Sequence, residues 1–457
     1  MKFIKDYPIG DIAPAPYNPR SITPEAFERL KSSIKEFGVV KPLIINTNGN
    51  IVAGHQRSRA LKALGITHAP VYKSTVPITY DQEIRFNLVH NQLEADKAPI
   101  QIDNKDTPLH SFFEISHDKI RFTGLAQMTY VSEYCKLLLK YGECGNVVID
   151  ENGAVIHNGE YAYSCVLMRK PCLVWQIRND ERESFIRYLK NDYGSYDFSR
   201  IKTHNYAQTY AQMHRSEETF ESRLYKRIIF PKVNRSQKIL DFGSGEGFGV
   251  HKLQKQGFNA YEYEPFRRKR SESVFNVPEI KQMIANVTAT VKESGLFDVV
   301  ILDSVLNSVK DSEWQDYVLT TVNSLLKESG ILYLATRSRV ALKTGPSRKY
   351  ACDRAETARA GFYCVDKDGY SLTFRNSVWF KQKFYDADEL HAFLSRYFDD
   401  VNVEIFNNML HAECRAKKRL SQEKYRQALI SEFNIEYPNN QRLNVHEELV
   451  DAILRLN

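Results

Sequence analysis

The stretch Ile239-Leu240-Asp241-Phe242-Gly243-Ser244-Gly245-Glu246-Gly247 decides the fold of the C-terminal half of the chain. Its short apolar run predicts a strand that ends in a glycine-rich turn, where missing side chains let a ligand approach the backbone. Helical spacing follows through Val250 and Leu253, and a second apolar run ends at Glu264, nineteen residues after Gly245. An acid at about that distance can accept hydrogen bonds from ribose hydroxyls. The pattern therefore predicts a nucleotide-type cofactor site.

Two further apolar runs, Phe297–Asp303 and Gly330–Leu334, predict strands with helices between them. Strands and helices that alternate in this way form a parallel sheet with its ligand at the carboxyl ends of the strands. The D-x-G-x-G-x-G form resembles class I S-adenosylmethionine-dependent methyltransferases over about residues 220 to 410. This implies a Rossmann-like domain, with a dehydrogenase as the alternative. The implied cofactor-binding residues are Asp241, Gly243 and Gly245 (the two glycines at the methionine end), Glu264 (ribose) and Asn286 (adenine).

The methyl acceptor is less well indicated. After Asp303 the chain continues Ser304-Val305-Leu306-Asn307, without the D/N-P-P-Y/W motif of amino-methylating DNA enzymes or the Pro-Cys pair of cytosine-C5 enzymes. We predict Asp303 and Asn307 as catalytic residues and Arg337 as a further contact; the alternative for Asp303 is a helix N-cap. We expect the segment from Lys343 to Asp368 to be a substrate lid, with a disordered loop as the alternative.

A second resemblance lies downstream, in Tyr370–Arg375, Trp379–Tyr385 and Glu389-Leu390. These segments resemble methyltransferases associated with DNA phosphorothioation. The resemblance implies a DNA-modification or mobile-element setting without naming an acceptor atom.

The first hundred residues carry a different pattern. Thr23-Pro24 predicts a helix start, Asn48-Gly49 predicts a hairpin turn, and a basic helix follows Gly54. A glycine before the free N–H groups of a helix, with arginines behind it, favours an anion site over an ordinary surface helix, which stays the alternative.

Three segments in order, Asn18-Pro19-Arg20, Leu30–Ile45 and Ile51–Ala60, resemble the N-terminal domain of the ParB/sulfiredoxin superfamily over about residues 5 to 97. The resemblance implies a nucleoside triphosphate with magnesium, and no cysteine follows Gly54, which excludes sulfiredoxin chemistry. His90 stands where the family has a glutamate, and His55-Gln56 replaces an acidic and basic pair, which favours nucleotide binding over hydrolysis. The implied nucleotide-binding residues are Gly54, His55, Gln56, Arg57, Arg59 and Asn91.

An internal repeat relates this region to the next one. Gly38 to Gly49 and Gly142 to Gly153 each span eleven positions and align without a gap. In the same register, Gly54–Arg59 becomes Asn158-Gly159-Glu160-Tyr161-Ala162-Tyr163, which has lost every basic residue. We predict a degenerate second ParB-like unit, with two unrelated hairpins as the alternative.

Composition sets the remaining limits. The 457 residues carry 42% hydrophobic and 26% charged residues with a net charge of +7, typical of a globular protein and compatible with a nucleic-acid partner. No apolar run is long enough for a membrane span, the N-terminus lacks a signal-like stretch, and the seven cysteines form no C-x-x-C, so we expect a cytoplasmic protein without a metal centre. The expected domains are 1–100 (ParB-like), 101–205 (degenerate copy), 206–415 (methyltransferase) and 416–457 (helical tail).

These patterns together predict an α/β protein: small ParB-like α+β domains followed by a Rossmann-like methyltransferase domain. We expect an S-adenosylmethionine-dependent methyltransferase that acts on nucleic acid, with DNA of a phage or mobile element as the first candidate, and a homodimer through the ParB-like domains. Two alternatives stay open: a nucleotide-gated DNA-binding module whose second domain senses S-adenosylmethionine, and a small-molecule methyltransferase.

Overall fold

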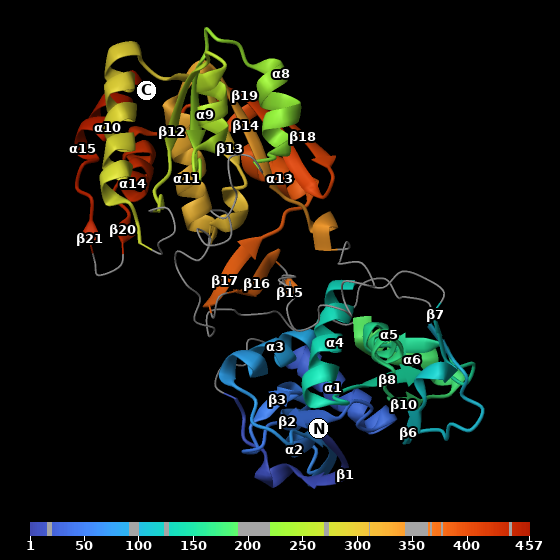
Figure 1. The fold of residues 1–457 in the computed structure, drawn as a ribbon. Helices are drawn as coiled ribbons and strands as arrows, with labels where there is room; N and C mark the ends of the chain where they lie inside the picture. The colour runs from blue at the N-terminus through green and yellow to red at the C-terminus, as the bar shows by residue number, and fades with distance from the viewer. Residues whose placement is uncertain are drawn as a thin grey trace. The chain divides into compact units, whose positions relative to one another are not determined.

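The chain divides into two units, which are described separately (Figure 1). The first unit comprises Met1–Lys202, Leu342–Asp368 and Leu372–Arg375, and the second comprises Thr203–Ala341, Gly369–Ser371 and Asn376–Asn457. The computed structural model describes residues 1–15, 21–90, 100–122, 128–190, 220–268, 274–309, 311–342, 364–365, 368–375, 378–437 and 441–457.

A six-stranded sheet in the order β12-β11-β13-β14-β19-β18 organises the second unit. The first four strands in this order are parallel, whereas β19 runs antiparallel to both β14 and β18. The parallel strands therefore end at one edge, and β19 begins there. The strands are β11 (Lys238–Phe242), β12 (Asn259–Tyr263), β13 (Phe297–Asp303), β14 (Leu326–Arg337), β18 (Phe398–Phe406) and β19 (Met409–Lys417).

Hydrophobic side chains pack on both faces of this sheet. Alternation along β13 sends Val300 and Leu302 into one cluster and Val299 and Ile301 into the other. The first cluster includes residues of α10 (Val277–Ser294), α11 (Ser312–Leu325), α13 (Ala387–Leu394), α14 (Gln422–Phe433) and α15 (Glu447–Leu456). The second cluster includes residues of the π-helix η5 (Tyr225–Ile229) and α9 (Phe248–Lys255), and the short α8 (Phe230–Lys232) continues η5.

The C-terminal segment expected as a helical tail, residues 416–457, belongs to this packed core. Leu429 of α14 and Ile453 of α15 are fully buried in the first cluster. The hydroxyl of Tyr437 donates to the carbonyl oxygen of Pro265 at 2.6 Å, and Tyr263 donates to that of Glu432 at 2.9 Å. The C-terminal segment therefore contacts the end of β12 and the loop that follows it. The remaining elements of the second unit are η6 (Leu306–Ser308), η7 (Arg339–Leu342), β17 (Val378–Lys383), β20 (Glu436–Tyr437) and β21 (Gln441–Arg442). Strands β15 (Cys364–Val365) and β16 (Tyr370–Arg375) pair in a three-stranded sheet with β17, and β15 and most of β16 are assigned to the first unit.

The first unit contains two four-stranded sheets of the same order and pairing senses. One is β1-β4-β2-β3 and the other is β6-β10-β8-β9. In each sheet the outer pairs are antiparallel and the central pair, β2 with β4 or β8 with β10, is parallel. The strands are β1 (Lys2–Pro8), β2 (Leu43–Ile45), β3 (Ile51–Ala53), β4 (His68–Lys73), β6 (Phe112–Ile115), β8 (Asn146–Ile149), β9 (Val155–His157) and β10 (Cys172–Gln176).

The two sheets repeat at a spacing of 104 residues. Helix α1 (Pro24–Phe37) has its counterpart in α4 (Met128–Tyr141), and the register shift between Ile44 and Ile45 recurs between Val148 and Ile149. We call residues 1–90 the first half and residues 100–190 the second half of this unit. The architecture agrees with the repeat seen in the sequence, while a ParB-like origin of the second half stays a prediction. The other elements are η1 (Ile9–Asp11), α2 (His55–Ala63), α3 (Tyr80–His90), β5 (Ile100–Ile102), η2 (His117–Lys119), β7 (Ile120–Phe122), α5 (Gly159–Met168), η3 (Asn179–Glu181) and α6 (Arg182–Lys190).

The two halves pack against each other through equivalent helices: α1 of the first half contacts α6 of the second, and α4 of the second half contacts α3 of the first. Phe37, at the end of α1, contacts Phe185 of α6 with ring centroids 5.4 Å apart. Its counterpart Tyr141, at the end of α4, contacts Phe86 of α3 at 5.1 Å. Each contact thus pairs the helix before the parallel strands of one half with the helix after the parallel strands of the other half.

Among the described residues, no helix is long and apolar enough to cross a membrane. The five cysteines that the described ranges characterise are buried and unbridged.

Candidate active site

The glycine turn after β11 is held against the end of β12. The amides of Gly243 and Ser244 both donate to the carbonyl oxygen of Tyr263, at 2.7 and 3.2 Å. Gly243 and Gly245 have φ of 82° and 60°, the left-handed region that favours glycine. A Cβ at Gly243 would lie 2.4 Å from Val305, whereas a Cβ at Gly245 would meet nothing within 4 Å. The turn therefore has no room for a side chain at Gly243, where Val305 packs against it, and is open to a ligand at Gly245.

Glu264 closes the turn from the neighbouring strand end. Its Oε2 accepts from the amide of Gly245 at 2.8 Å, and its Oε1 accepts from the amide of Phe266 at 2.9 Å. The side chain is buried, and burial raises its pKa above the usual range, opposed by those two backbone hydrogen bonds. Gly245 and Glu264, both predicted as cofactor-binding residues, are thus in direct contact with each other.

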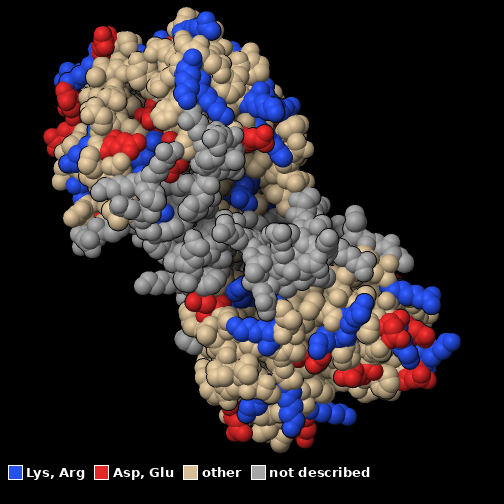
Figure 2. All heavy atoms as spheres, in the orientation of Figure 1, with Lys and Arg blue, Asp and Glu red and all other residues tan. Residues whose placement is uncertain are grey.

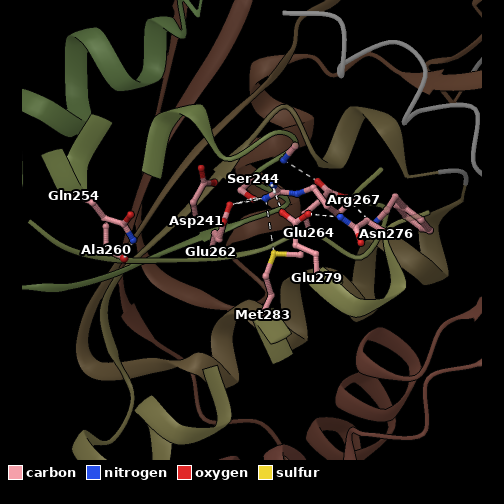
Figure 3. Close-up of polar contacts among 12 residues, drawn as sticks. Asp241, Ser244, Gln254, Ala260, Glu262, Glu264, Arg267, Asn276, Glu279 and Met283 are labelled. Atoms are coloured by element: carbon pink, nitrogen blue, oxygen red, sulfur yellow. Dashed lines mark hydrogen bonds and ion pairs between the residues drawn. The ribbon is translucent and has the colours of Figure 1, made fainter. Parts of the chain in front are cut away.

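Glu262 and Arg267 form an ionic group beside this turn that the sequence did not single out (Figure 3). Glu262 accepts from the Ser244 hydroxyl at 3.0 Å and from Arg267 at 2.5 Å. Arg267 also pairs with Glu279 of α10 at 3.0 Å, and its side chain is only 5% exposed. Arg267 opens the basic run Arg267–Arg270, and its side chain is enclosed between these two acids rather than solvated. The sequence signal for this ionic group is a pair of acids two positions apart, Glu262 in β12 and Glu264 just after it.

Asp241 is the most perturbed acid of the site. Its Oδ2 accepts from the Tyr225 hydroxyl at 2.5 Å, while its Oδ1 is buried without a hydrogen-bond partner. Burial raises its pKa to about 8, helped by the nearby negative charges of Asp303, Glu262 and Glu264. A buried carboxylate oxygen without a donor is costly unless a ligand supplies one.

Asp303, at the end of β13, is held by two hydroxyls. Ser222 donates to its Oδ2 at 2.5 Å and Ser304 donates to its Oδ1 at 3.0 Å. Ser304 itself has φ of 61°, an uncommon conformation for a residue with a side chain. The alternative role of Asp303 as a helix cap does not apply, since Asp311 caps α11.

The other three predicted residues of this unit differ in their placement. Asn307 lies in η6, 2% exposed, and donates to Ser308 at 3.2 Å while its Oδ1 is buried and unpartnered. Asn286 lies on the exposed face of α10 and accepts from Gln282 at 2.9 Å. The structure does not bring Asn286 to the glycine turn, because its helix turns the opposite face, with Met283 and Val287, toward the sheet. Arg337 stacks over Phe384 at 5.6 Å.

The predicted anion site of the first unit is only partly open. Gly54 caps α2 with φ of 102°, and a Cβ there would lie 2.5 Å from Leu43. Arg57 donates backward to the carbonyl oxygens of Lys41 and, at 2.9 Å, Pro42. Arg59 donates to Gln56 at 2.7 Å on the exposed surface of the helix. Gln56 and Arg59 are therefore the more accessible of the predicted ligands.

Two histidines of this half are neutral. The Nε2 of His55 accepts from the amide of Ala15 at 3.3 Å, and burial, assisted by Arg57, lowers its pKa to about 4. Burial also holds the pKa of His90 well below its usual range, and both of its ring nitrogens lack hydrogen-bond partners. Asn91 lies outside the described residues, as do Asn18-Pro19-Arg20 and most of the Lys343–Asp368 segment.

Magnesium does not fit what is described of this half. A neutral imidazole at His90 replaces the glutamate that the resemblance implied, and no cluster of three His, Cys, Asp or Glu side chains suited to a metal occurs among the residues that can be described. The helix start with Gln56 and Arg59 still suits an anion.

The comparisons with known families match the two units separately. The ParB N-terminal domain family matches residues 1–92, and a methyltransferase domain family matches residues 211–395.

The chain thus joins a region that matches the ParB N-terminal domain family to a region that matches a methyltransferase domain family. The predicted fold class is thereby confirmed.

The alignments with curated relatives are longer than the match to the ParB N-terminal domain family. The Stage 0 sporulation protein J of Bacillus subtilis is 31% identical over 139 residues, which are 30% of this chain and 49% of that protein. A "Probable chromosome-partitioning protein ParB" of Campylobacter jejuni is 28% identical over 134 residues, which are 28% of this chain and 48% of that protein. The chain thus spans about half the length of these curated relatives.

Solved structures resemble each domain only distantly. The Burkholderia thailandensis 1,6-didemethyltoxoflavin-N1-methyltransferase, with bound 1,6-didemethyltoxoflavin and S-adenosylhomocysteine, is 15% identical with a TM-score of 0.31, covering 49% of this chain and 95% of its own. The C-terminally truncated Caulobacter crescentus ParB complexed with CTP-gamma-S is 19% identical with a TM-score of 0.20, covering 31% and 64%. At these TM-scores neither likeness carries weight for the function of this chain.

Proposed function

We propose that the chain is an S-adenosylmethionine-dependent methyltransferase that acts on nucleic acid, with DNA as the first candidate. The observation that carries the cofactor assignment is the buried, unpartnered Oδ1 of Asp241 beside a glycine turn that is open at Gly245. A carboxylate oxygen without a donor suits a ligand ammonium group, which S-adenosylmethionine carries at its methionine end.

The residues present fit that ligand. Asp241 would accept from its ammonium group, Gly243 and Gly245 would lie along the methionine end, and Glu264 would accept from the ribose hydroxyls. Tyr225 holds Asp241 in place through its hydroxyl. S-adenosylmethionine supplies an electrophilic methyl group on a sulfonium, so the chain's own task is to align an acceptor with it. Asp303 and Asn307 lie at the same sheet edge and are proposed to face the acceptor.

The nucleic-acid assignment rests on the ParB-like domain, because its relatives are named as chromosome-partitioning proteins. On the face drawn in Figure 2, lysines and arginines are interspersed with acidic side chains, so net charge alone marks no binding surface. We propose DNA engagement, a nucleotide at Gln56 and Arg59, a cytoplasmic location and a mobile-element setting as parts of one function. The phosphorothioation-associated subtype belongs to the same proposal. The predicted homodimer remains part of the proposal. It would form through a surface other than the one through which the two halves of the first unit contact each other.

A small-molecule methyltransferase is the second candidate. The observation that favours it is the burial of Asn307, 2% exposed, at the acceptor edge, together with Ser304 where amino-methylating DNA enzymes carry proline. A small acceptor reaches such an edge without a base being flipped out of a duplex.

Calorimetric titration of the full-length chain with S-adenosylmethionine tests the cofactor assignment. We expect micromolar binding that Glu264→Ala weakens at least tenfold, because the variant removes the ribose acceptor and leaves the Gly245 amide unpaired. Glu293→Gln, on the exposed side of α10, is the matched control and leaves the affinity unchanged. Absence of binding to the unaltered chain contradicts the proposal.

Transfer of tritium from [methyl-³H]S-adenosylmethionine to duplex DNA, single-stranded DNA, RNA or a small-molecule extract then identifies the acceptor class. A gel-shift series at low and high salt runs in parallel, since phosphate contacts strengthen at low salt. DNA binding without transfer, with S-adenosylmethionine bound, supports the sensing alternative. Transfer only to small molecules supports the second candidate.

A further inference from the structure

His411 occupies a place in the sheet that no sequence pattern indicated. It lies near the start of β19, directly opposite Ala335 of β14, and Ala335 lies opposite Asp303 of β13. Because β19 runs antiparallel to β14, its first residues lie at the edge where the parallel strands end. Asp303, Ala335 and His411 therefore form one row across three adjacent strands.

The three side chains share one face of the sheet. Asp303 alternates in step with Val299 and Ile301, which belong, like Ala335, to the cluster beneath η5 and α9. Glu413, two residues after His411, pairs with Lys232 of α8 on that same face at 2.6 Å. Strands lie about 4.8 Å apart, so the Cα atoms of Asp303 and His411 are roughly 10 Å apart, with Ala335 on the strand between them.

His411 and Asp303 differ in how their polar atoms are satisfied. Both carboxylate oxygens of Asp303 accept from serine hydroxyls. His411 is 1% exposed, and its buried Nδ1 has no hydrogen-bond partner. Both oxygens of Asp303 are thus occupied by donors, whereas the imidazole keeps an open site for a proton.

The charges around His411 come from each element packed against it. Asp303 and Glu404 lie across the sheet, and Arg223 and Arg227 lie on the segment that includes η5. Burial is the largest effect and lowers the pKa of His411, Asp303 and Glu404 oppose it, and the two arginines add to it. The ring is therefore neutral, and able to accept a proton, at physiological pH.

We propose that His411 and Asp303 form a proton-accepting pair that faces the methyl acceptor over Ala335. The inference rests on the proposed function and adds the acceptor class: a hydroxyl or N–H group that must lose its proton, rather than a lone pair on an atom without hydrogen. The acceptor's lone pair bonds to the methyl carbon, the carbon–sulfur bond breaks with its electrons passing to sulfur, and the acceptor's proton moves to Nδ1 of His411. Asp303 stabilises the imidazolium that results.

The first test needs no acceptor. The full-length chain labelled with [¹³Cε1]histidine is titrated by NMR with saturating S-adenosylhomocysteine, and the His411 signal is assigned with His411→Gln. We expect Asp303→Asn, which keeps the shape of the side chain, to lower the His411 midpoint by about one pH unit. Glu293→Gln is the control and leaves it unchanged. A His411 midpoint that Asp303→Asn does not move overturns the pair.

The second test uses the transfer assay once the acceptor is known. We expect His411→Gln to slow transfer about 100-fold or more and to remove one limb of the pH–rate profile, with the affinity for S-adenosylhomocysteine unchanged. Unaltered transfer, or an acceptor atom that carries no hydrogen, overturns the inference. Failure of the unaltered chain to bind S-adenosylhomocysteine contradicts the proposed function instead, and the titration, run without ligand, still decides the pair.

Discussion

The two halves of the first unit build the same sheet but use the helix start after the third strand differently. In the first half, α2 begins after Gly54 and carries Arg57, which donates to the carbonyl oxygens before β2. At the matching place in the second half stands Tyr161, whose hydroxyl accepts from the amide of Cys144 before β8. An arginine in the first half and a tyrosine in the second half thus connect equivalent helices to equivalent loops.

The cap residues differ in the same sense. Asn158 replaces Gly54 and keeps the left-handed conformation, with φ of 65°. Its amide donates to the carbonyl oxygen of Asn146 at 2.8 Å and its Oδ1 accepts from Tyr134 at 2.9 Å. The second half therefore fills with hydrogen-bonded side chains the turn that the first half leaves to glycine. The comparison teaches that the same sheet and helix start can be stabilised by a glycine with an arginine or by an asparagine with a tyrosine.

The largest expected effect is on the packed turn of the second half. Tyr161→Ala removes a fully buried ring and should lower the free energy of unfolding by about 4 kcal/mol, whereas Tyr161→Phe loses only the hydroxyl and about 1 kcal/mol. Urea unfolding read by hydrogen exchange in β10 measures both. Tyr80→Ala, 49% exposed, is the control and should change little. Equal effects of the two Tyr161 variants would contradict a packing role.

A pH effect on stability is expected in the first half, where His55 has Gly159 as its counterpart. The folded pKa of about 4 lies below the unfolded value of 6.5, so the neutral ring contributes stability above pH 6.5 that is lost as the pH falls toward 4. The loss should reach about 3 kcal/mol for this largely buried group. Urea unfolding of the unaltered chain and of His55→Gln between pH 7.5 and 4 measures it. A parallel decline in both proteins would assign the effect to other groups.

Exchanging the two cap residues sharpens the comparison further. Gly54→Asn should cost about 2 kcal/mol, because φ of 102° and the nearby Leu43 both oppose a side chain. Asn158→Gly should cost about 1 kcal/mol, since the backbone tolerates glycine and only hydrogen bonds are lost. Thermal unfolding of both variants tests the ranking. The reverse order would mean that the second half depends on its cap more than the first.

The smallest effect is expected on nucleotide affinity. Arg59→Gln should weaken CTP or ATP binding about twofold, because an exposed cation near a helix start contributes little. Lys62→Gln, farther along α2, serves as the control. Magnesium should leave the affinity unchanged, since His90 offers a neutral ring in place of a carboxylate. Calorimetry with and without magnesium measures this, and a tenfold gain with the metal would restore the magnesium site that the described residues argue against.

Much of the candidate site was predictable because it is local in sequence. The contact between Gly245 and Glu264 follows from a strand, a turn and a spacing of nineteen residues. Asn286 failed because helical spacing does not say which face of a long helix meets the sheet. The enclosure of Arg267 could not be predicted, because a run of basic residues looks the same whether it is solvated or enclosed by Glu262 and Glu279.

The sequence by itself determined the order of the two domains, the glycine turns and the internal repeat, since each depends on residues within about one supersecondary unit of one another. Only the tertiary structure decided that Tyr225 holds Asp241, that the C-terminal helices belong to the methyltransferase core, and that His411 lies in one row with Asp303. Tyr225 and Asp241 are 16 positions apart. Tyr263 and Glu432, whose hydrogen bond anchors the C-terminal helices, are 169 positions apart. The sheet brings them together because parallel strands from distant parts of the chain end at one edge, and no local pattern records which neighbours meet there.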